Sequence, residues 1–141
     1  MVLEGVWHNA LYTLPTIIPE LQNRSVISVV GGYSHFGALT SSGTLLTWGR
    51  YFHGNLGLGD PGKLPGGSPG GYAEEEQRVE ARSRPPDVTV PTEVRFDHGL
   101  TAEGRVKRYC FAAAAGGNST AALVVDLVED EAPPEGLEWR A

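Results

Sequence analysis

The sequence predicts an all-β chain of short antiparallel strands. Three observations support this fold class: apolar runs rich in β-branched residues that are too short for helices, a glycine turn between two such runs, and a second copy of the pattern later in the chain. The chain has 141 residues, 40% of them hydrophobic. This composition suffices for the core of one small domain or of part of a larger one.

The first ordered unit begins with residues 25–40, SVISVVGGYSHFGALT, which predict two strands on either side of a glycine pair. A turn follows at residues 41–43, because Gly43 can adopt the positive φ that a short hairpin loop needs. Residues 44–48, TLLTW, predict the next strand. Both faces of these strands carry apolar side chains. We therefore expect both faces of the sheet to be covered.

Residues 61–92 predict a long mobile insertion, dense in glycine and proline at each end. Its middle, residues 74–84, can form one or two helical turns with local ion pairs. Exposed pairs contribute about 0.3 to 0.5 kcal/mol each, too little to order a segment of this length against its chain entropy. The acidic, proline-bearing tail at residues 129–141 is also expected to be mobile.

Residues 105–128 repeat the plan of the first unit. With Leu39 placed on Leu123, Gly32 falls on Gly116, which is an offset of 84 residues. Without the insertion the underlying period is about 50 residues, and such periods are typical of solenoids, propellers and arrays.

Three submotifs in a fixed order carry a resemblance to a known family. They are GGYSHFGALT at 31–40, GTLLTWG at 43–49 and GNLGLGD at 54–60. Together they resemble the repeat of the regulator of chromosome condensation, the unit of a seven-bladed β-propeller. The insertion after GLGDP, the PTEVRF return strand at 91–96 and the final ALVVDL look like the C-terminal repeats of fungal F-box propeller proteins of the SCF-associated factor type. The resemblance implies about two antiparallel blades of a partial β-propeller.

The resemblance also implies a domain organisation. Residues 1–24 would be the end of a preceding blade or an N-terminal extension, 25–60 the first propeller repeat, 61–92 the insertion, 93–128 a second, incomplete repeat, and 129–141 the acidic tail. The structural repeat signature would consist of Gly32, His35, Leu39, Gly43, Trp48, Gly49, Gly54, Leu56, Gly57, Gly59, Gly116 and Leu123.

Several of these residues have expected roles. Gly54, Gly57 and Gly59 let the backbone turn, Leu56 and Leu58 fill the core between blades, and Trp48 packs blade against blade. In the resembled repeat, the histidine at the position of His35 ties a loop by hydrogen bonds. The second repeat has Asn118 and Ser119 where its relatives usually have Trp-His, and this departure weakens the expected locking there.

Gly57, Gly59 and Gly62 have the spacing G-x-G-x-x-G, with Lys63 directly behind them. A phosphate-binding loop of this kind needs a helix after its glycines. Pro61 interrupts the motif, and sequence rich in Gly and Pro follows it. We interpret the glycines as turn residues.

The sequence offers no pattern for catalysis, a cofactor or a metal. The four histidines lack ligand spacing, and Cys110 is the only cysteine. Cys110 lies in an apolar run, where an inert buried thiol is expected, and Ser119 lacks the surroundings of a nucleophile. We therefore expect no enzyme, no cofactor, no metal site and no small-molecule substrate.

Net charge and targeting signals indicate which partners and which cellular compartment to expect. With 17 acidic and 11 basic residues, the net charge of -6 disfavours nucleic acid. The sequence contains no apolar stretch of about 18 residues, which argues against a membrane span, and shows neither a signal peptide nor a disulfide framework. A cytoplasmic or nuclear protein that is not secreted is expected.

The best candidates for partner binding follow the third predicted strand: Arg50, Tyr51, Phe52, His53 and Asn55. Arginine and aromatic residues on a rigid turn are typical of a binding hot spot. The alternative is that Tyr51 and Phe52 pack beneath the insertion. The residues alone leave both interpretations open.

Two blades cannot close a seven-bladed ring, so we expect a fragment of a longer protein or a chain that pairs with others. The resemblance implies a non-enzymatic interaction module, the substrate-recognition part of a fungal F-box-type ubiquitin ligase adaptor, with a ubiquitylation client or the remaining blades as protein partner. One alternative is a guanine-nucleotide exchange or chromatin-associated regulator of a small GTPase. Another is a truncated copy without independent function.

Overall fold

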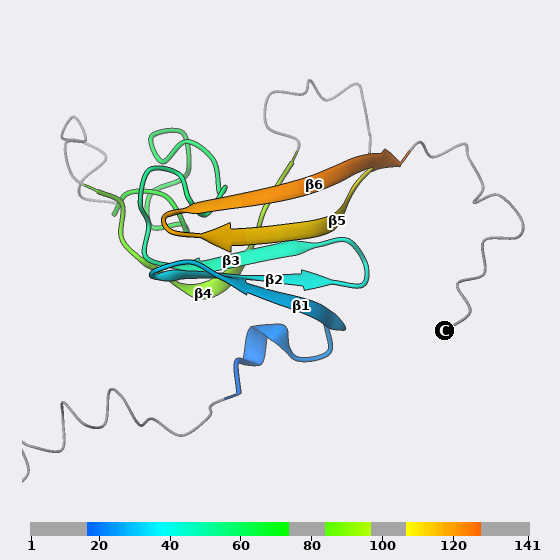
Figure 1. Cartoon of the computed structure of the whole chain (residues 1–141). Helices are drawn as coiled ribbons and strands as arrows, with labels where there is room; N and C mark the ends of the chain where they lie inside the picture. The colour runs from blue at the N-terminus through cyan, green and yellow to red at the C-terminus, as the bar shows by residue number, and fades with distance from the viewer. Residues whose placement is uncertain (1–16, 74–83, 97–106, 128–141) are drawn as a thin grey trace, which may run out of the picture.

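The computed structural model describes residues 17–73, 84–96 and 107–127, which form two stacked antiparallel sheets (Figure 1). The first sheet has the order β1-β2-β3-β4 and the second pairs β5 with β6. The predicted all-β fold class is confirmed. The elements are η1 (Pro19–Leu21, a 3-10 turn), β1 (Val26–Gly31), β2 (His35–Thr40), β3 (Leu45–Gly49), β4 (Val88–Glu93), β5 (Lys107–Gly116) and β6 (Ser119–Leu127).

The hairpin of β2 and β3 forms as its sequence predicts. Gly43 adopts φ +81° in the turn, and Thr40 closes it: its Oγ1 accepts a hydrogen bond from the Thr44 backbone N–H at 3.1 Å and lies 2.9 Å from the Ser42 hydroxyl. A Cβ on Gly43 would also lie 2.3 Å from the Tyr109 ring. Two constraints therefore require glycine here, the backbone conformation and the close approach of the second sheet.

The fourth strand corrects the predicted boundaries of the insertion. The insertion was expected to extend to residue 92 and a return strand to occupy residues 91–96. The strand instead spans Val88–Glu93, pairs with β3 and completes the first sheet. The return strand was expected to begin at Pro91, whereas β4 begins three residues earlier and has Pro91 in its interior, where proline usually argues against a strand. Proline is tolerated on an edge strand, and β4 is one.

The rest of the predicted insertion is described only in part. Residues 61–73 form consecutive turns, held by backbone hydrogen bonds such as Gly67 N–H to Tyr72 C=O at 2.8 Å. The helical turns considered for residues 74–84 and the tail at 129–141 lie almost wholly outside the described residues. Within the predicted N-terminal segment 1–24, the described part contains η1 and no strand.

The second sheet reproduces the β1–β2 pair of the first sheet at the predicted offset of 84 residues. In the β1–β2 pair Val29 lies opposite Ala38, and in the β5–β6 pair Ala113 lies opposite Ala122. Each pair has a β-bulge at the equivalent place, at Ile27 in β1 and at Phe111 in β5. Bulges interrupt a ladder at specific positions. The shared bulge therefore confirms that the two strand pairs are copies of one unit.

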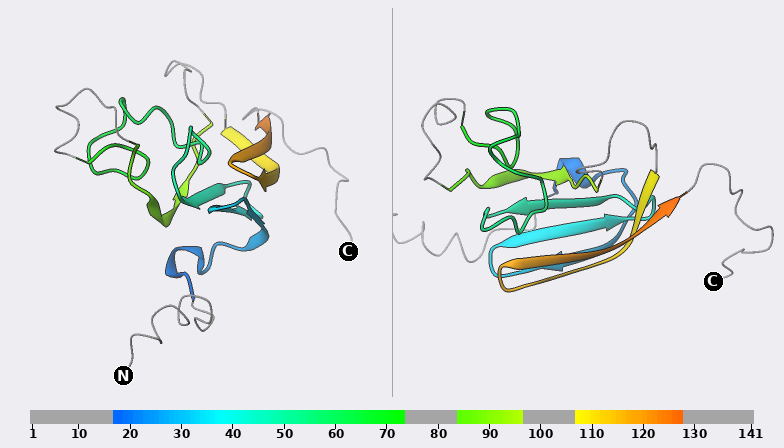
Figure 2. Two further views of the ribbon diagram at one scale, coloured as in Figure 1. Left: turned by 60° about the vertical axis from the view of Figure 1, so that its left-hand side comes forward. Right: turned by 90° about the horizontal axis from the view of Figure 1, so that it is seen from above.

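The two sheets stack through one apolar contact (Figures 1 and 2). Leu39 and Leu45 of the first sheet are buried together with Cys110 of β5, and Ala122 and Val124 of β6 pack against this cluster. We call the side of the first sheet that takes part in this contact its inner face and the opposite side its outer face. Burial of this apolar area is the main favourable term that holds the sheets together.

Hydrogen bonds fasten both ends of the contact. At the end near the β2–β3 turn, Cys110 donates its backbone N–H to Gly43 C=O at 2.9 Å, and the Tyr109 hydroxyl bonds Ser41 C=O at 2.6 Å. At the other end, Tyr33 N–H bonds Gly117 C=O at 2.8 Å. A side-chain bond lies beside it: His35 Nε2 is 2.8 Å from the Thr120 hydroxyl.

His35 is fully buried, and its ring lies against Gly32 so closely that a Cβ there would come within 2.2 Å of the ring. Nδ1 of His35 has no hydrogen-bond partner among the described residues. Thr120 therefore supplies the one hydrogen bond of the ring in this part of the chain. The loop-tying role implied for this histidine becomes, in the structure, a bond between sheets.

A pair of glycine substitutions tests the close approach of the sheets. Gly43→Ala and Gly54→Ala both place a side chain at positive φ, which costs about 1 to 2 kcal/mol, but a Cβ on Gly54 meets nothing within 4 Å. The Tyr109 ring should make Gly43→Ala costlier by a further 1 to 3 kcal/mol or so. Urea unfolding measures both; equal losses of stability would contradict the described contact.

A second substitution tests the hydrogen bond between the sheets. Thr120→Val keeps the shape of the side chain but leaves the buried His35 ring unpaired, so we expect a loss of about 1 to 3 kcal/mol of unfolding free energy. Alkylation of the buried Cys110 thiol should also become faster as the sheets separate more often. Thr89→Val, at an exposed position of the edge strand β4, is the control and should change neither quantity.

Candidate functional site

The candidate site is a surface at the end of the first sheet opposite the Gly43 turn. It is built from two chain segments, the β1–β2 turn and the segment that follows β3. The Arg50 backbone N–H bonds Ser34 C=O at 2.8 Å and so joins the segments. We call the exposed residues Tyr33, Arg50, Phe52 and His53 the turn surface.

Asn55 fixes the geometry of the segment after β3. Its side-chain Oδ1 accepts a hydrogen bond from Phe52 N–H at 2.9 Å, and its Nδ2 donates to Arg50 C=O at 3.0 Å. A backbone bond from Asn55 N–H to Phe52 C=O adds a third link at 3.0 Å. Asn55 is buried. The structure therefore places it beneath the turn surface as a support, where a partner could not touch it directly.

Tyr51 is also buried, in the cluster that holds the sheets together. Its backbone N–H lies 3.3 Å from the Asp87 carboxylate, at the far end of the insertion. Burial raises the pKa of the Tyr51 hydroxyl, and the nearby Tyr72 and Asp60 add to that rise. Of the two interpretations of Tyr51, packing beneath the insertion matches this position.

Three of the five predicted partner-binding residues remain exposed. The Phe52 ring is 37% exposed and meets the His53 ring edge-on, with ring centroids 4.3 Å apart. His53 adopts φ +47°, a conformation uncommon outside glycine. Arg50 forms no ion pair within residues 17–73, 84–96 and 107–127. The described residues therefore leave its guanidinium without an ion pair, and a partner could bind it.

Tyr33 belongs to this surface although the sequence analysis did not select it. It is 86% exposed, while its backbone N–H is held by Gly117 of the second sheet. The signal was present in the sequence as a large aromatic residue within a turn, after a glycine pair. An exposed tyrosine on a fixed backbone loses little conformational entropy when it binds a partner.

The glycine motif behind the turn surface has the predicted architectural role. Gly54, Gly57 and Gly59 all have positive φ. Leu56 and Leu58 are buried in the core cluster, and Thr47 donates its hydroxyl to Leu56 C=O at 2.6 Å. No α-helix occurs among the described residues, so the helix N-terminus that a phosphate loop requires is missing there.

The remaining signature residues differ in their exposure. Gly49 has φ +110° and lies too close to Ser34 C=O for a side chain. Trp48 is half-buried on the outer face: it stacks on Phe36 with centroids 5.9 Å apart and also contacts the core cluster. Leu39 is buried, whereas its repeat equivalent Leu123 is 59% exposed.

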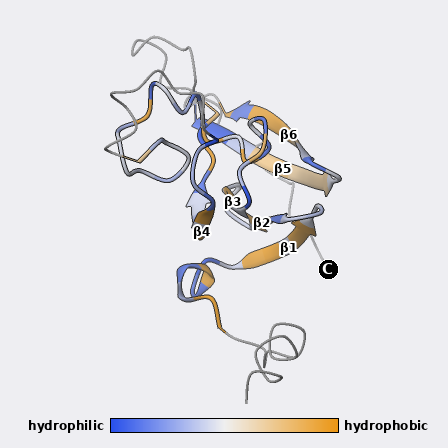
Figure 3. Ribbon diagram, turned by 90° about the vertical axis from the view of Figure 1, so that its left-hand side faces the viewer, coloured by the Kyte–Doolittle hydropathy of each residue, from blue (hydrophilic) through white to orange (hydrophobic). Residues whose placement is uncertain are grey.

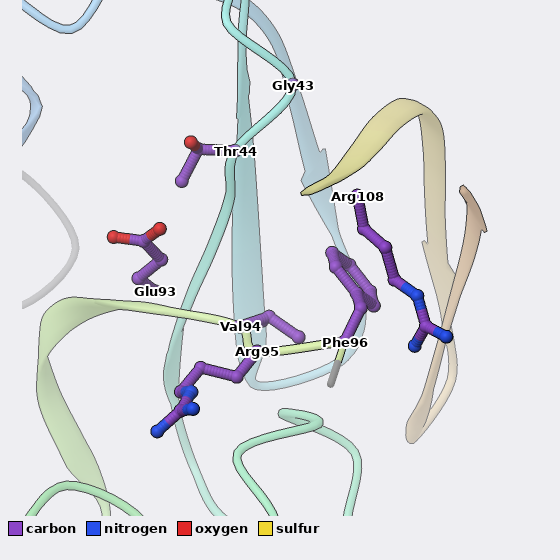
Figure 4. Close-up of a pocket in the computed structure, with 7 residues that line it drawn as sticks. All are labelled: Gly43, Thr44, Glu93, Val94, Arg95, Phe96 and Arg108. Atoms are coloured by element: carbon purple, nitrogen blue, oxygen red, sulfur yellow. The ribbon is translucent and has the colours of Figure 1, made fainter. Parts of the chain in front are cut away.

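A cavity of about 210 Å³ lies at the opposite end of the sheets, between the Gly43 turn and Arg108. Figure 4 shows that its charged groups diverge: Glu93, Arg95 and Arg108 point in different directions around Val94 and Phe96. Arg108 is also engaged by Asp126, with Nε and Oδ1 2.8 Å apart. This arrangement lacks the convergent polar groups of a ligand site.

The described residues contain no cluster of three or more histidine, cysteine, aspartate or glutamate side chains that could hold a metal. Burial raises the pKa of the Cys110 thiol, which makes the reactive thiolate rarer. None of the described segments forms a helix of the length and apolarity needed to span a bilayer.

The raised pKa of Tyr51 predicts a pH dependence of stability. The folded state holds the hydroxyl proton more tightly than the unfolded chain, so this contribution is complete below the ordinary tyrosine pKa near 10 and is lost as pH rises through the higher folded pKa. Tyr51→Phe has no proton to lose. Unfolding midpoints measured from about pH 8 to 11 should fall more steeply for the wild type; parallel curves would contradict the shift.

No family model matches the chain. Among curated proteins, the E3 ubiquitin-protein ligase HERC2 of Homo sapiens is 46% identical over 46 residues, and HERC2 of Mus musculus is equally similar. The match covers 33% of this chain and 1% of HERC2.

Among solved structures, the chain is similar to Prp20p from Saccharomyces cerevisiae, with a TM-score of 0.53 and 19% identity over 84% of this chain and 20% of Prp20p. A structure of yeast RCC1 (Prp20) bound to Kap60 is also similar, with a TM-score of 0.43 and 23% identity over 79% of this chain and 19% of that one. The chain thus spans about a fifth of these neighbours. Together with the stacked sheets, the likeness to Prp20p shows the fold: antiparallel blades of a partial β-propeller.

Proposed function

We propose that this chain is a non-enzymatic protein-interaction module that recognises its partner through the turn surface. The observation that carries the proposal is a backbone fixed by hydrogen bonds beneath exposed side chains. Asn55 and Ser34 hold the segment after β3, and Gly117 holds Tyr33, while Arg50 and Phe52 face solvent. Such preorganised arginine and aromatic residues are typical of interface anchors.

The relatives support a protein as the partner. The structural study of Prp20p describes its binding to Gsp1p and histones, and HERC2 is named a ubiquitin ligase. In finer detail, we propose that the chain recognises a client for ubiquitylation, as the resemblance to fungal F-box propeller proteins implies. Regulation of a small GTPase is the alternative that the likeness to Prp20p favours.

Affinity purification of the full chain from its own cells tests this proposal. The double variant Arg50→Ala/Phe52→Ala should recover at least tenfold less of the partner, equal to about 1.4 kcal/mol or more. Arg24→Ala is the matched control, because Arg24 is exposed near the opposite, Gly43 end of the sheet. It should recover the same partner as the wild type.

The identity of the recovered protein distinguishes the alternatives. Ligase subunits together with a client support the ubiquitin-ligase role, and a small GTPase supports the regulatory one. Recovery of chaperones alone by all three proteins would instead indicate a copy without independent function. A partner retained in full by the double variant would overturn the assignment to the turn surface.

A further inference from the structure

A cavity with polar walls lies at the end of the first sheet opposite the turn surface. Its volume is about 340 Å³, at the lower end of the range of about 300 to 1,000 Å³ that is usual for ligand sites. Two chain segments line it, residues 23–25 before β1 and residues 40–42 and 44 around the β2–β3 turn. These segments meet at one end of the sheet (Figure 1), where Ser41 donates its backbone N–H to Ser25 C=O at 2.9 Å. We call this cavity the polar hollow.

The polar hollow is lined by one arginine, one asparagine, three serines and two threonines, and by no carboxylate. Figure 3 shows that the segment joining η1 to β1 is hydrophilic, in contrast to the apolar strand that follows it. Arg24 is exposed and forms no ion pair with the part of the chain that the structure describes. A guanidinium presents its N–H donors in a planar fork that matches two oxygens of a phosphate or carboxylate. This lining therefore suits an oxyanion.

Thr40 and Ser42 orient a hydroxyl donor in the hollow. Thr40 is only 1% exposed, and its Oγ1 accepts a hydrogen bond from Thr44 N–H at 3.1 Å. The Ser42 Oγ lies 2.9 Å from the same Thr40 oxygen. A buried hydroxyl is best satisfied when it also donates its proton, so we assign Thr40 as the donor to Ser42. The proton of the exposed Ser42 hydroxyl is then free to bond an anion.

The backbone before β1 adopts an unusual conformation at the hollow. Asn23 has φ +60° and Ser25 has φ +50°, in a region that few residues other than glycine occupy. The backbone N–H groups of Ser25 and Ser42 have no hydrogen-bond partner within residues 17–73, 84–96 and 107–127. Strained backbone often occurs where a ligand is held, and N–H groups in such turns are typical donors to anions.

The charge at this end of the sheet also favours an anion. The residues that line the hollow and the neighbouring cavity of Figure 4 include three arginines and one carboxylate: Arg24, Arg95, Arg108 and Glu93. Asp126 pairs with one of these arginines, so an excess of positive charge remains. The whole chain, in contrast, has a net charge of -6. A local positive potential on an acidic protein attracts small anions to that place.

We infer that the polar hollow binds the phosphate group of a phosphate monoester. Arg24 supplies the positive charge, and the Ser42 hydroxyl and the backbone N–H groups of Ser25 and Ser42 supply further donors. A monoester phosphate matches them, because it carries a charge of about -1.5 to -2 at pH 7 and three strong acceptor oxygens. The hollow shares no residue with the turn surface and does not depend on the proposed function. Arg24→Ala should therefore lose phosphate and still recover the partner of the turn surface.

Titration of the full chain with inorganic phosphate, followed by amide NMR shifts, tests the inference. The Ser25 and Ser42 signals should move and saturate, whereas sodium chloride at equal ionic strength should leave them in place. Arg24→Ala should weaken binding at least about tenfold, because a charged hydrogen bond is lost. Arg24→Lys keeps the charge without the planar fork and should bind with intermediate strength.

Lys63→Ala is the matched control. Lys63 is an exposed cation outside the hollow, with its side chain 84% exposed, and it directly follows the G-x-G-x-x-G motif. This variant should bind phosphate as the wild type does. Loss of binding in Lys63→Ala, with binding retained in Arg24→Ala, would locate the anion at the glycine motif and overturn the inference. Equal shifts with chloride would indicate an adventitious ion only and would overturn it as well.

Two esters identify the source of the phosphate group. One is a short peptide with a single phosphoserine, and the other is glycerol phosphate. Binding of either ester supports the inference, and the tighter of the two shows whether a modified protein or a small metabolite supplies the group. Binding of neither ester, or equal binding of the unphosphorylated peptide, would exclude a phosphate monoester as the ligand.

Discussion

The contact between the two sheets is the interaction on which the rest of the structure depends. It buries Leu39 and Leu45 against Cys110 and positions Tyr33 through Gly117. The turn surface is held from below by the same cluster, because Tyr51, Leu56 and Leu58 belong to it. Loss of this contact would remove the support of the turn surface and expose the core at the same time. Stability and the proposed recognition of a partner therefore depend on one set of residues.

Local sequence signals predicted the hairpin and the repeat because each depends on neighbouring residues. Gly43 indicated its turn through its own backbone freedom, and the copied pattern of glycine and apolar residues indicated the second unit. Strand β4 was expected only through the family resemblance, as a return strand at 91–96, and not from local residue signals. It joins the sheet across a long insertion, and the composition around Pro91 is that of a loop, so its start at Val88 was not predicted. Only the edge position of the strand explains why proline is tolerated there.

Burial at the candidate site was equally hard to infer. Arg50, Tyr51, Phe52, His53 and Asn55 are almost contiguous, and their types all suit an interface. Which of them face solvent depends on Asp87 and on the core cluster, both of which involve residues distant in sequence. Leu39 and Leu123 show the same limit. Their equivalent positions in the repeat differ in exposure because one has a neighbouring sheet and the other has none among the described residues.

The pairing of β3 with β4 has a consequence for the segment between them. Gly49 pairs with Val88, so the ends of the intervening loop meet on one rung of the ladder. The entropy of closing a flexible loop grows only logarithmically with its length, at about 0.6 kcal/mol for each doubling. Extra sequence added after residue 73, beyond the core residues Tyr51, Leu56 and Leu58, would thus cost the sheet little stability. An experimenter could graft a new peptide or a reporter domain at that place in the chain.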